Sequence, residues 1–173
     1  LMELSRIASH LIYFSKIAGA VEFASIKNHC LREWEKFSDI FEMYSGSRLG
    51  FGAICIGGVR EDASDGWFFR IEKALSSLDV FLQDLNSVLL DHPFFKERAV
   101  GLAAYKKEDI LEWNITGPNA RCAGVDRDIR SDAPYVAYSD IMKKENIDSS
   151  WCGDAWSRSK YRVREIYDSM NLI

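Results

Sequence analysis

Between Gly66 and Asp91, apolar residues recur at every third or fourth position, and this pattern restricts the possible folds more than any other feature of the sequence. The repeating positions are Phe68, Ile71, Leu75, Leu78, Leu82, Leu85 and Leu89. Residues with this spacing share one face of an α-helix, so the stretch predicts a long helix with one apolar stripe. Because such a stripe has to be buried, we expect an antiparallel helical bundle, with Asp65 as the N-cap of this helix.

Two further helices are predicted before this one. The first carries its apolar residues at Leu4, Ile7, Ala8, Leu11, Phe14 and Ala18. The second is expected from Val21 to Tyr44, with one face formed by Ile26, Cys30, Trp34, Phe37, Phe41 and Tyr44. Gly46 is predicted to cap it, because glycine enters the left-handed conformation at little cost. The glycine-rich residues 50–59 predict an extended segment with a tight turn.

The second half of the chain contains shorter predicted elements. Their order is a helical turn at 94–98 after His92-Pro93, a short strand at 100–105, a short helix from Lys107 to Trp113, a loop-rich region at 114–134, and a last helix after Gly153-Asp154. The buried side of the last helix is predicted to consist of Trp156, Val163, Ile166, Tyr167 and Met170. The expected fold is mainly α with a minor β component, in a single domain over residues 1–173.

Composition excludes several classes of protein. A chain of 173 residues that is 47% hydrophobic is large enough to bury a core. The net charge of −4 gives no basic footprint for nucleic acid. The sequence has no apolar run that approaches the roughly 18–20 residues of a membrane span. The cysteines, which are Cys30, Cys55, Cys122 and Cys152, form no Cys-x-x-Cys pair, so we interpret them as reduced, intracellular packing residues.

Both ends of the sequence lack the signals of a complete chain. The helical pattern of Leu1–Leu11 starts without an N-cap, and Ile173 follows an amphipathic helix with no stop signal. We therefore expect the central fragment of a longer subunit.

No catalytic set and no metal site is predicted. The three histidines, His10, His29 and His92, have no ligand partner at metal spacing, and no nucleophile–base–acid set can be assembled. The Gly50-Phe-Gly52 and Gly57-Gly58 clusters lack the lysine of a phosphate-binding loop. We interpret these glycines as backbone turns that let neighbouring segments approach closely.

Two charged segments remain. Arg121, Asp128 and Arg130 lie in a ten-residue stretch around Gly124, which is consistent with a loop held by bidentate ion pairs or with a solvated charged turn. The last helix carries four basic residues, whose even spacing spreads them around its surface and favours a solvated or subunit-facing role. They are Arg158, Lys160, Arg162 and Arg164.

Several motifs follow one another in an order that is more specific than any one of them. The motifs are Glu3-Leu-Ser-Arg6 through His10, the charged run Arg32–Lys36, Gly46-Ser-Arg48, Gly57-Gly58-Val59-x-x-Asp62, Asp65-Gly66-Trp67, Pro93–Arg98, Gly117-Pro118-x-x-Arg121-x-x-Gly124-x-x-x-Asp128-x-Arg130, Pro134-Tyr135-x-x-Tyr138 and Gly153-Asp154. The set resembles the large subunit shared by respiratory complex I, where it is known as the D or 49 kDa subunit, and the related nickel-iron hydrogenases. Asp65-Gly66-Trp67 favours the complex I branch.

The resemblance implies a helical fold like that of hydrogenase large subunits and a place in a proton-translocating NADH:quinone oxidoreductase. In that family the subunit lies at the junction of the peripheral and membrane arms, on the cytoplasmic or mitochondrial matrix side of the inner membrane. There it helps to form the pocket where quinone takes electrons from an iron–sulfur cluster of a neighbouring subunit. The implied partners are the iron–sulfur B subunit and the C subunit of the peripheral arm, together with the membrane-arm subunits.

The family's quinone-headgroup histidine and tyrosine lie upstream of Leu1, so the resemblance implies no cofactor bound by this chain and no catalysis by it alone. One alternative is a fragment of a membrane-bound nickel-iron hydrogenase large subunit, whose Cys-x-x-Cys pairs lie near the chain ends. The other is a diverged, non-catalytic structural or assembly subunit.

Departures from the family pattern affect groups that the resemblance places near quinone and proton transfer. Ala20 stands where the family has an acidic residue, Gly50 where it often has a histidine, Cys55 where it has an arginine, and Lys27-Asn28 where it has an aromatic pair. Arg48 is retained, and we expect it either to support a cluster or orient the quinone cavity, or to cap the preceding helix. Gly57, Gly58, Arg121, Asp128 and Arg130 are expected to be structural loop residues.

Overall fold

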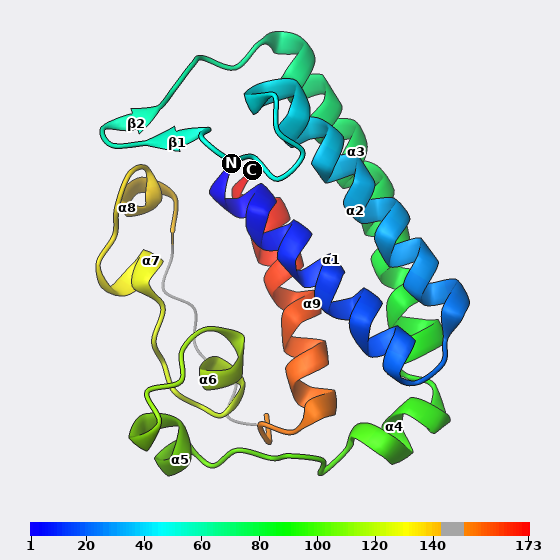
Figure 1. Cartoon of the computed structure of the whole chain (residues 1–173). Helices are drawn as coiled ribbons and strands as arrows, with labels where there is room; N and C mark the ends of the chain where they lie inside the picture. The colour runs from blue at the N-terminus through cyan, green and yellow to red at the C-terminus, as the bar shows by residue number, and fades with distance from the viewer. Residues whose placement is uncertain (143–150) are drawn as a thin grey trace. The chain divides into compact units, whose positions relative to one another are not determined.

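The computed structural model describes residues 1–142 and 151–173, which form two compact units, Leu1–Leu89 and Leu90–Ile173 (Figure 1). The first unit contains the helices α1 (Met2–Ala20), α2 (Ala24–Ser45) and α3 (Asp65–Leu85), and α3 continues as the short π-helical segment η1 (Asn86–Leu90). A hairpin of β1 (Ile54–Cys55) and β2 (Gly58–Val59) lies between α2 and α3. The expectation of a single domain stays a prediction.

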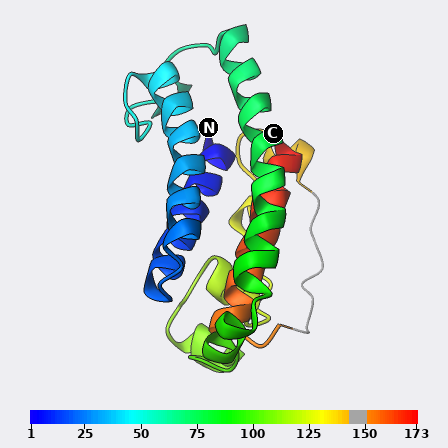
Figure 2. The same ribbon diagram turned by 90° about the vertical axis from the view of Figure 1, so that its right-hand side faces the viewer.

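The three long helices of the first unit pack as an antiparallel series, with α1 on α2 and α2 on α3 (Figures 1 and 2). Val21, Glu22 and Phe23 reverse the chain between α1 and α2, and Glu22 adopts a left-handed φ of 63°. The predicted apolar face of α1 is buried throughout. The predicted mainly α fold with a minor β component is confirmed.

The apolar stripe of α3 is confirmed except at its start. Ile71, Leu78, Leu82, Leu85 and Leu89 are buried and Leu75 is half-buried, but Phe68 is 52% exposed. The adjacent Trp67 is buried instead, and its indole Nε1 donates a hydrogen bond to the Ile40 carbonyl at 2.9 Å. Because the indole needs both apolar contact and an acceptor, Trp67 rather than Phe68 anchors this end of α3 on α2.

The ends of α2 and α3 show one correct prediction and one error. Gly46 caps α2 in the left-handed conformation, with φ of 71°, as predicted. The N-cap of α3 is Ser64, and Asp65 is the first residue of the helix rather than its cap. A carboxylate in the first turn still interacts favourably with the positive end of the helix dipole.

The predicted extended segment with a tight turn is confirmed as a short antiparallel hairpin, in which Ile54 pairs with Val59 and Cys55 with Gly58. Gly57 lies in the turn with φ of 95°, and Gly58 has φ of 144°. No atom lies within 4 Å of the position that a Cβ would take on either residue, so conformation rather than close approach favours glycine there.

The second unit is built from short helices and one long one. Its elements are α4 (Pro93–Ala99), α5 (Lys107–Glu112), α6 (Pro118–Cys122), α7 (Ile129–Asp132), α8 (Tyr138–Ile141) and α9 (Ala155–Leu172). Both α4 and α6 pack against α9. On α9, Val163 and Ile166 are buried as predicted, whereas the other three predicted positions are half-buried. Asp154 is the N-cap and accepts a hydrogen bond from the Ser157 amide at 2.7 Å.

The strand predicted at 100–105 is wrong. Residues 100–103 form turns in which Gly101 and Ala103 have φ values of 74° and 48°, so the backbone cannot stay extended. The segment is held by Asp154 instead, whose carboxylate accepts a hydrogen bond from the Gly101 amide at 2.7 Å. Across the part of the chain that the structure describes, no helix is long and apolar enough to cross a membrane.

The glycine cap of α2 allows a matched test. Replacing Gly46 with alanine should lower the free energy of unfolding by about 1 kcal/mol, because a Cβ is unfavourable in the left-handed conformation. Gly66 is the control, since it lies in the first turn of α3 and a Cβ there meets only Met43 Cε at 3.6 Å. Gly66→Ala should therefore be neutral or stabilising. Urea unfolding of both variants measures the difference, and an equal effect would contradict this role of Gly46.

Candidate functional site

Arg48, the one residue that the sequence singled out for function, lies just after the end of α2 and folds back along that helix. Its guanidinium group binds the carboxylates of Glu35, Asp39 and Glu42, with distances of 2.9 Å to Asp39 and 2.8 Å to Glu42. These acceptors occupy the last turns of α2 at positions i, i+4 and i+7, which share one helix face. Arg48 therefore binds side-chain carboxylates rather than the main-chain carbonyls expected of a capping residue.

The electrostatics of this cluster hold Arg48 firmly in its charged form. Hydrogen bonds to Asp39 and Glu42 raise the pKa of the guanidinium group. All four side chains are more than two-fifths exposed, so solvent screens the cluster and its main effect is geometric. Three carboxylates around one cation also leave the group with a local excess of negative charge.

A pocket of about 270 Å³ lies beside Arg48, between α1 and α2. Its polar lining includes Ser5, Ser9 and Ser38, and its apolar lining includes Ile12, Trp34 and Phe41. Serine hydroxyls beside an aromatic wall suit a small, mostly apolar group with one polar end. The described lining contains no base that could activate a serine, so the pocket has the properties of a binding cavity rather than of a catalytic centre.

Gly50 and Cys55, two of the departures from the family pattern, lie in the segment after Arg48. Gly50 has a left-handed φ of 70°, and a Cβ there would lie 3.2 Å from Phe41 Cδ1. A larger residue would therefore need both a change of backbone and a shift of Phe41, so the missing side chain has a local structural reason. Cys55 is exposed on β1. Of the other departures, Ala20 is the exposed last residue of α1, and Lys27 and Asn28 are exposed in the first turns of α2.

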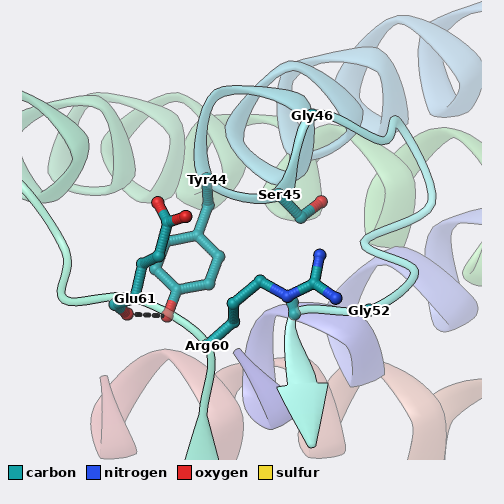
Figure 3. A pocket seen from close by; sticks show the side chains of 7 residues that line it. Tyr44, Ser45, Gly46, Gly52, Arg60 and Glu61 are labelled. Carbon is teal, nitrogen blue, oxygen red and sulfur yellow. Dashed lines mark hydrogen bonds between the residues drawn. The ribbon is translucent and has the colours of Figure 1, made fainter.

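A second pocket, of about 240 Å³, lies between the end of α2 and the hairpin (Figure 3). Tyr44, Ser45 and Gly46 line one side, and Gly52 and Arg60 line the other. The Tyr44 hydroxyl donates a 2.5 Å hydrogen bond to the Glu61 carbonyl, which ties the chain leaving the hairpin to α2. In Figure 3 the Arg60 guanidinium group points into this space, whereas the carboxylate of Glu61, which also lines the pocket, lies beside the Tyr44 ring.

The second charged segment, in the second unit, forms a network that is largely removed from solvent. Arg121 binds Glu165 of α9 through two of its nitrogens, with Nε at 2.9 Å, and it lies 3.7 Å from Asp128. Asp128 in turn binds Arg130 in a bidentate pair at 3.1 and 2.7 Å. The exposed fractions of Arg121, Asp128 and Arg130 are 13%, 16% and 11%, so the alternative of a solvated charged turn is wrong.

The ion pairs determine the charge states in this network. Burial alone would raise the pKa of Asp128, but hydrogen bonds from Arg130 and the charge of Arg121 hold it below its usual value. Burial likewise acts to lower the pKa of Arg121, and the Glu165 charge outweighs it and raises that pKa. Both groups are therefore ionised near neutral pH, and they pin the 117–130 loop to α9.

Two acidic residues, Glu165 and Glu33, are buried although the sequence did not predict it. Glu165 has a side chain only 1% exposed, and its arginine partner lies 44 positions earlier, so no local pattern indicated the pair. Glu33 is 2% exposed and binds Lys36 at 2.5 Å, and Lys36 also contacts Ser77 of α3 at 2.8 Å. Glu33 could have been found, because it lies three residues after Cys30 and four before Phe37, on the apolar face of α2.

The other candidate residues behave mostly as packing or capping groups. Cys30 and Cys122 are buried as predicted, and burial raises the pKa of their thiols to about 12 and about 11. Cys55 and Cys152 are exposed, which corrects the packing interpretation for those two. His10 is buried, and His92 caps α4. Residues 1–142 and 151–173 contain no group of three or more His, Cys, Asp or Glu placed to hold a metal ion.

The basic residues of α9 are half-buried rather than freely solvated. Arg158 donates to the Ala103 and Gly153 carbonyls, and Lys160 binds Asp91 at 2.9 Å. Arg162 contacts the Asn119 side chain at 3.3 Å. Three of the four therefore hold neighbouring parts of the second unit together, which corrects the solvated alternative, while the subunit-facing alternative stays a prediction.

Residues 21–173 match the protein family described as respiratory-chain NADH dehydrogenase, 49 Kd subunit. Similar relatives include the D subunit of the NADH-quinone oxidoreductase of Bacillus cereus ATCC 10987, which is 32% identical, and those of Bacillus mycoides KBAB4 and Bacillus anthracis, each 31% identical. These alignments cover 99% of this chain and 46% of each relative. The chain thus spans just under half the length of the curated relatives it matches, and the resemblance predicted from its motifs is confirmed.

The Arg121–Glu165 pair should be strongly coupled. Arg121→Met should lower the free energy of unfolding by about 3 to 5 kcal/mol, because it removes the guanidinium group that binds the buried Glu165 carboxylate. The double variant Arg121→Met/Glu165→Met should recover most of this loss, since it removes both charges. Urea unfolding of the single and double variants gives the coupling energy. Additive losses would show that the pair is not a coupled unit.

Asp128 should contribute to acid stability. Because its folded pKa lies below its unfolded value, it stabilises the fold above about pH 4, and this contribution is lost as the pH falls through the folded pKa. Asp128→Asn should therefore reduce both the stability at pH 7 and its decline on acidification. The control is Asp62→Asn, at an exposed site in the first unit, which should keep the wild-type acid profile. Thermal unfolding between pH 2.5 and 7 measures both profiles.

Proposed function

Because the chain belongs to the family of the 49 kDa subunit of respiratory-chain NADH dehydrogenase, we propose that it is part of the subunit that receives quinone in a proton-translocating NADH:quinone oxidoreductase. The observation that carries the proposal is the family match over residues 21–173. Since the chain spans 46% of its relatives, the proposed role is that of a portion of the subunit. This portion supports one wall of the quinone-binding junction and contacts neighbouring subunits.

The first unit supplies the elements for the proposed junction. The pocket of about 270 Å³ beside Arg48 has serine hydroxyls and an aromatic wall, which suits part of a quinone or of its isoprenoid chain. Arg48 is held by Glu35, Asp39 and Glu42, so its proposed role is to orient the end of α2 and the hairpin. Arg48 also lines this pocket, but because its guanidinium group is bound by three carboxylates, its proposed role is to position the surrounding chain.

The proposed cofactors belong to the assembled complex. Quinone and an iron–sulfur cluster of a neighbouring subunit supply the redox chemistry, and the residues of this chain shape and support the junction between them. The proposed neighbours are the iron–sulfur B subunit and the C subunit of the peripheral arm, together with the membrane-arm subunits. The proposed location is peripheral, at the inner membrane, on the cytoplasmic or mitochondrial matrix side.

A non-catalytic structural subunit is the second candidate, and a specific observation favours it. The motif residues Arg121, Asp128 and Arg130 hold a loop on α9, whereas Gly50 and Cys55 stand where the family carries ionisable groups. A chain that keeps its structural networks and loses such groups fits a supporting role. The hydrogenase alternative gains no support from the family match or from the relatives named above.

Purification of the native assembly separates these candidates. The tagged chain is extracted from the membranes of its own host in mild detergent, co-purifying subunits are identified by mass spectrometry, and NADH:quinone reductase activity is measured. Subunits of an NADH:quinone oxidoreductase with activity would support the leading proposal. The same subunits without activity, in a preparation where the other redox centres are intact, would favour the structural role. Their absence would overturn both.

Arg48→Met tests the positioning role. In the purified complex we expect kcat/KM for quinone to fall by on the order of tenfold, mainly through a higher KM, because the end of α2 is no longer held. Arg70→Met is the control, since Arg70 is an exposed arginine on α3. Unchanged kinetics with normal assembly would rule out the role of Arg48. A parallel loss of assembled complex would assign it to structure alone.

A further inference from the structure

The chain from Leu49 to Val59, which we call the apolar hairpin, exposes an unusual amount of apolar surface. It contains no charged residue, and Ala53 is its one buried hydrophobic side chain. The exposed members are Leu49 at 60%, Phe51 at 73%, Ile54 at 55%, Ile56 at 107% and Val59 at 51%. Single exposed apolar residues are common, but five within one short hairpin indicate an interaction surface.

The hairpin is also too short to be stable through its own pairing. Each strand has two residues, and the ladder has two residue pairs. An isolated two-stranded hairpin is at best marginally stable in water. At its base it is anchored by the Tyr44 hydroxyl on the Glu61 carbonyl and by the Arg60 amide on the Ala53 carbonyl at 3.2 Å. The segment is thus held at its base and exposed at its tip, where Ile56 lies.

Arg60 adds a specific polar feature at that base. Within the described residues its guanidinium group has no hydrogen bond and no ion pair, and it points into the pocket of about 240 Å³ (Figure 3). Gly52 leaves room for it, since a Cβ on Gly52 would lie 3.8 Å from Arg60 Nη1. The neighbouring Glu61 carboxylate lies beside the Tyr44 ring and forms no ion pair with Arg60 (Figure 3). The pocket, which Glu61 also lines, therefore presents a guanidinium group that is free to bind an entering carboxylate.

We propose that the apolar hairpin packs into an apolar surface of a neighbouring protein chain and that the pocket receives an aspartate or glutamate of that chain, paired with Arg60. Charge complementarity points to an acidic group, because the guanidinium group of the exposed Arg60 has no carboxylate partner within the described residues. Protein interfaces combine a charge-depleted apolar core with arginine anchors in the same way. The inference rests on the proposed function in one respect, namely that the chain works within an assembly.

The same charges disfavour a membrane surface as the occupant. Anionic lipids attract clusters of lysine and arginine, and the hairpin carries none. Its flanks carry Arg60 beside Glu61 and Asp62, and Arg48 beside three carboxylates. The hairpin and its flanks therefore lack the cluster of basic residues that an anionic bilayer needs, whereas one carboxylate of a protein needs only the single guanidinium group of Arg60.

The test uses the full chain in its native assembly, with two variants and two matched controls. Ile56→Asp places a charge at the tip, and Arg60→Glu reverses the charge in the pocket. Val80→Asp is the control for the first, because Val80 is 62% exposed on α3, and Arg70→Glu is the control for the second. Both hairpin variants should lower the amount of chain retained in the purified complex by about tenfold. The controls should be retained like the wild type, and circular dichroism should show the same helix content for all four.

A photo-cross-linker at position 56 identifies the partner. The expected product joins this chain to another subunit, and reversing an acidic residue near the cross-link to lysine should restore retention of Arg60→Glu. A cross-link to a second copy of this chain or to lipid would overturn the proposal, as would full retention of both hairpin variants. If the wild-type chain purifies without oxidoreductase subunits, the proposed function fails. The further inference is then still tested, because the cross-link and the charge reversal show whether the hairpin and Arg60 bind an acidic residue of the protein that co-purifies.

Discussion

The left-handed turn at Gly46 is the constraint on which the arrangement of the first unit depends. It ends α2 and turns the chain away from the helix axis, so that Arg48 can return to the carboxylates on the outer face of α2. The residues after this turn form the apolar hairpin. Where the hairpin ends, the Tyr44 hydroxyl of α2 donates a hydrogen bond to the Glu61 carbonyl. At the start of α3, the Trp67 indole donates a hydrogen bond to the Ile40 carbonyl and so holds α3 against α2. Both pockets of this region lie against residues that this turn positions.

Guanidinium–carboxylate pairs serve two different purposes in the molecule. Around Arg48 the groups are exposed, so screening leaves little net energy and the cluster chiefly determines the direction of the chain. Around Arg121 the groups are removed from water, and each charge depends on its partner because an unpaired buried ion is costly. The first arrangement suits an adjustable surface near a proposed interface, and the second suits a fixed connection between a loop and α9.

The departures from the family pattern acquire a physical context in the structure. Gly50 adopts a left-handed conformation against Phe41, so this position favours the absence of a side chain. Arg60 presents a guanidinium group at the base of the same hairpin that carries Cys55. The segment therefore combines apolar surface with one available charge, which is consistent with a role in assembly beside the proposed quinone junction.

Local patterns in the sequence by themselves determined the long helices, the glycine cap at Gly46 and the hairpin, because helical periodicity and turn conformation depend on residues a few positions apart. They also indicated ion pairing around Asp128 and Arg130, which are two residues apart. Only the tertiary structure decided that Trp67 rather than Phe68 is buried and that residues 100–103 form turns held by Asp154. It also joined Arg121 to Glu165 across 44 positions, since which distant charge shares a buried site depends on how the helices pack and not on spacing along the chain.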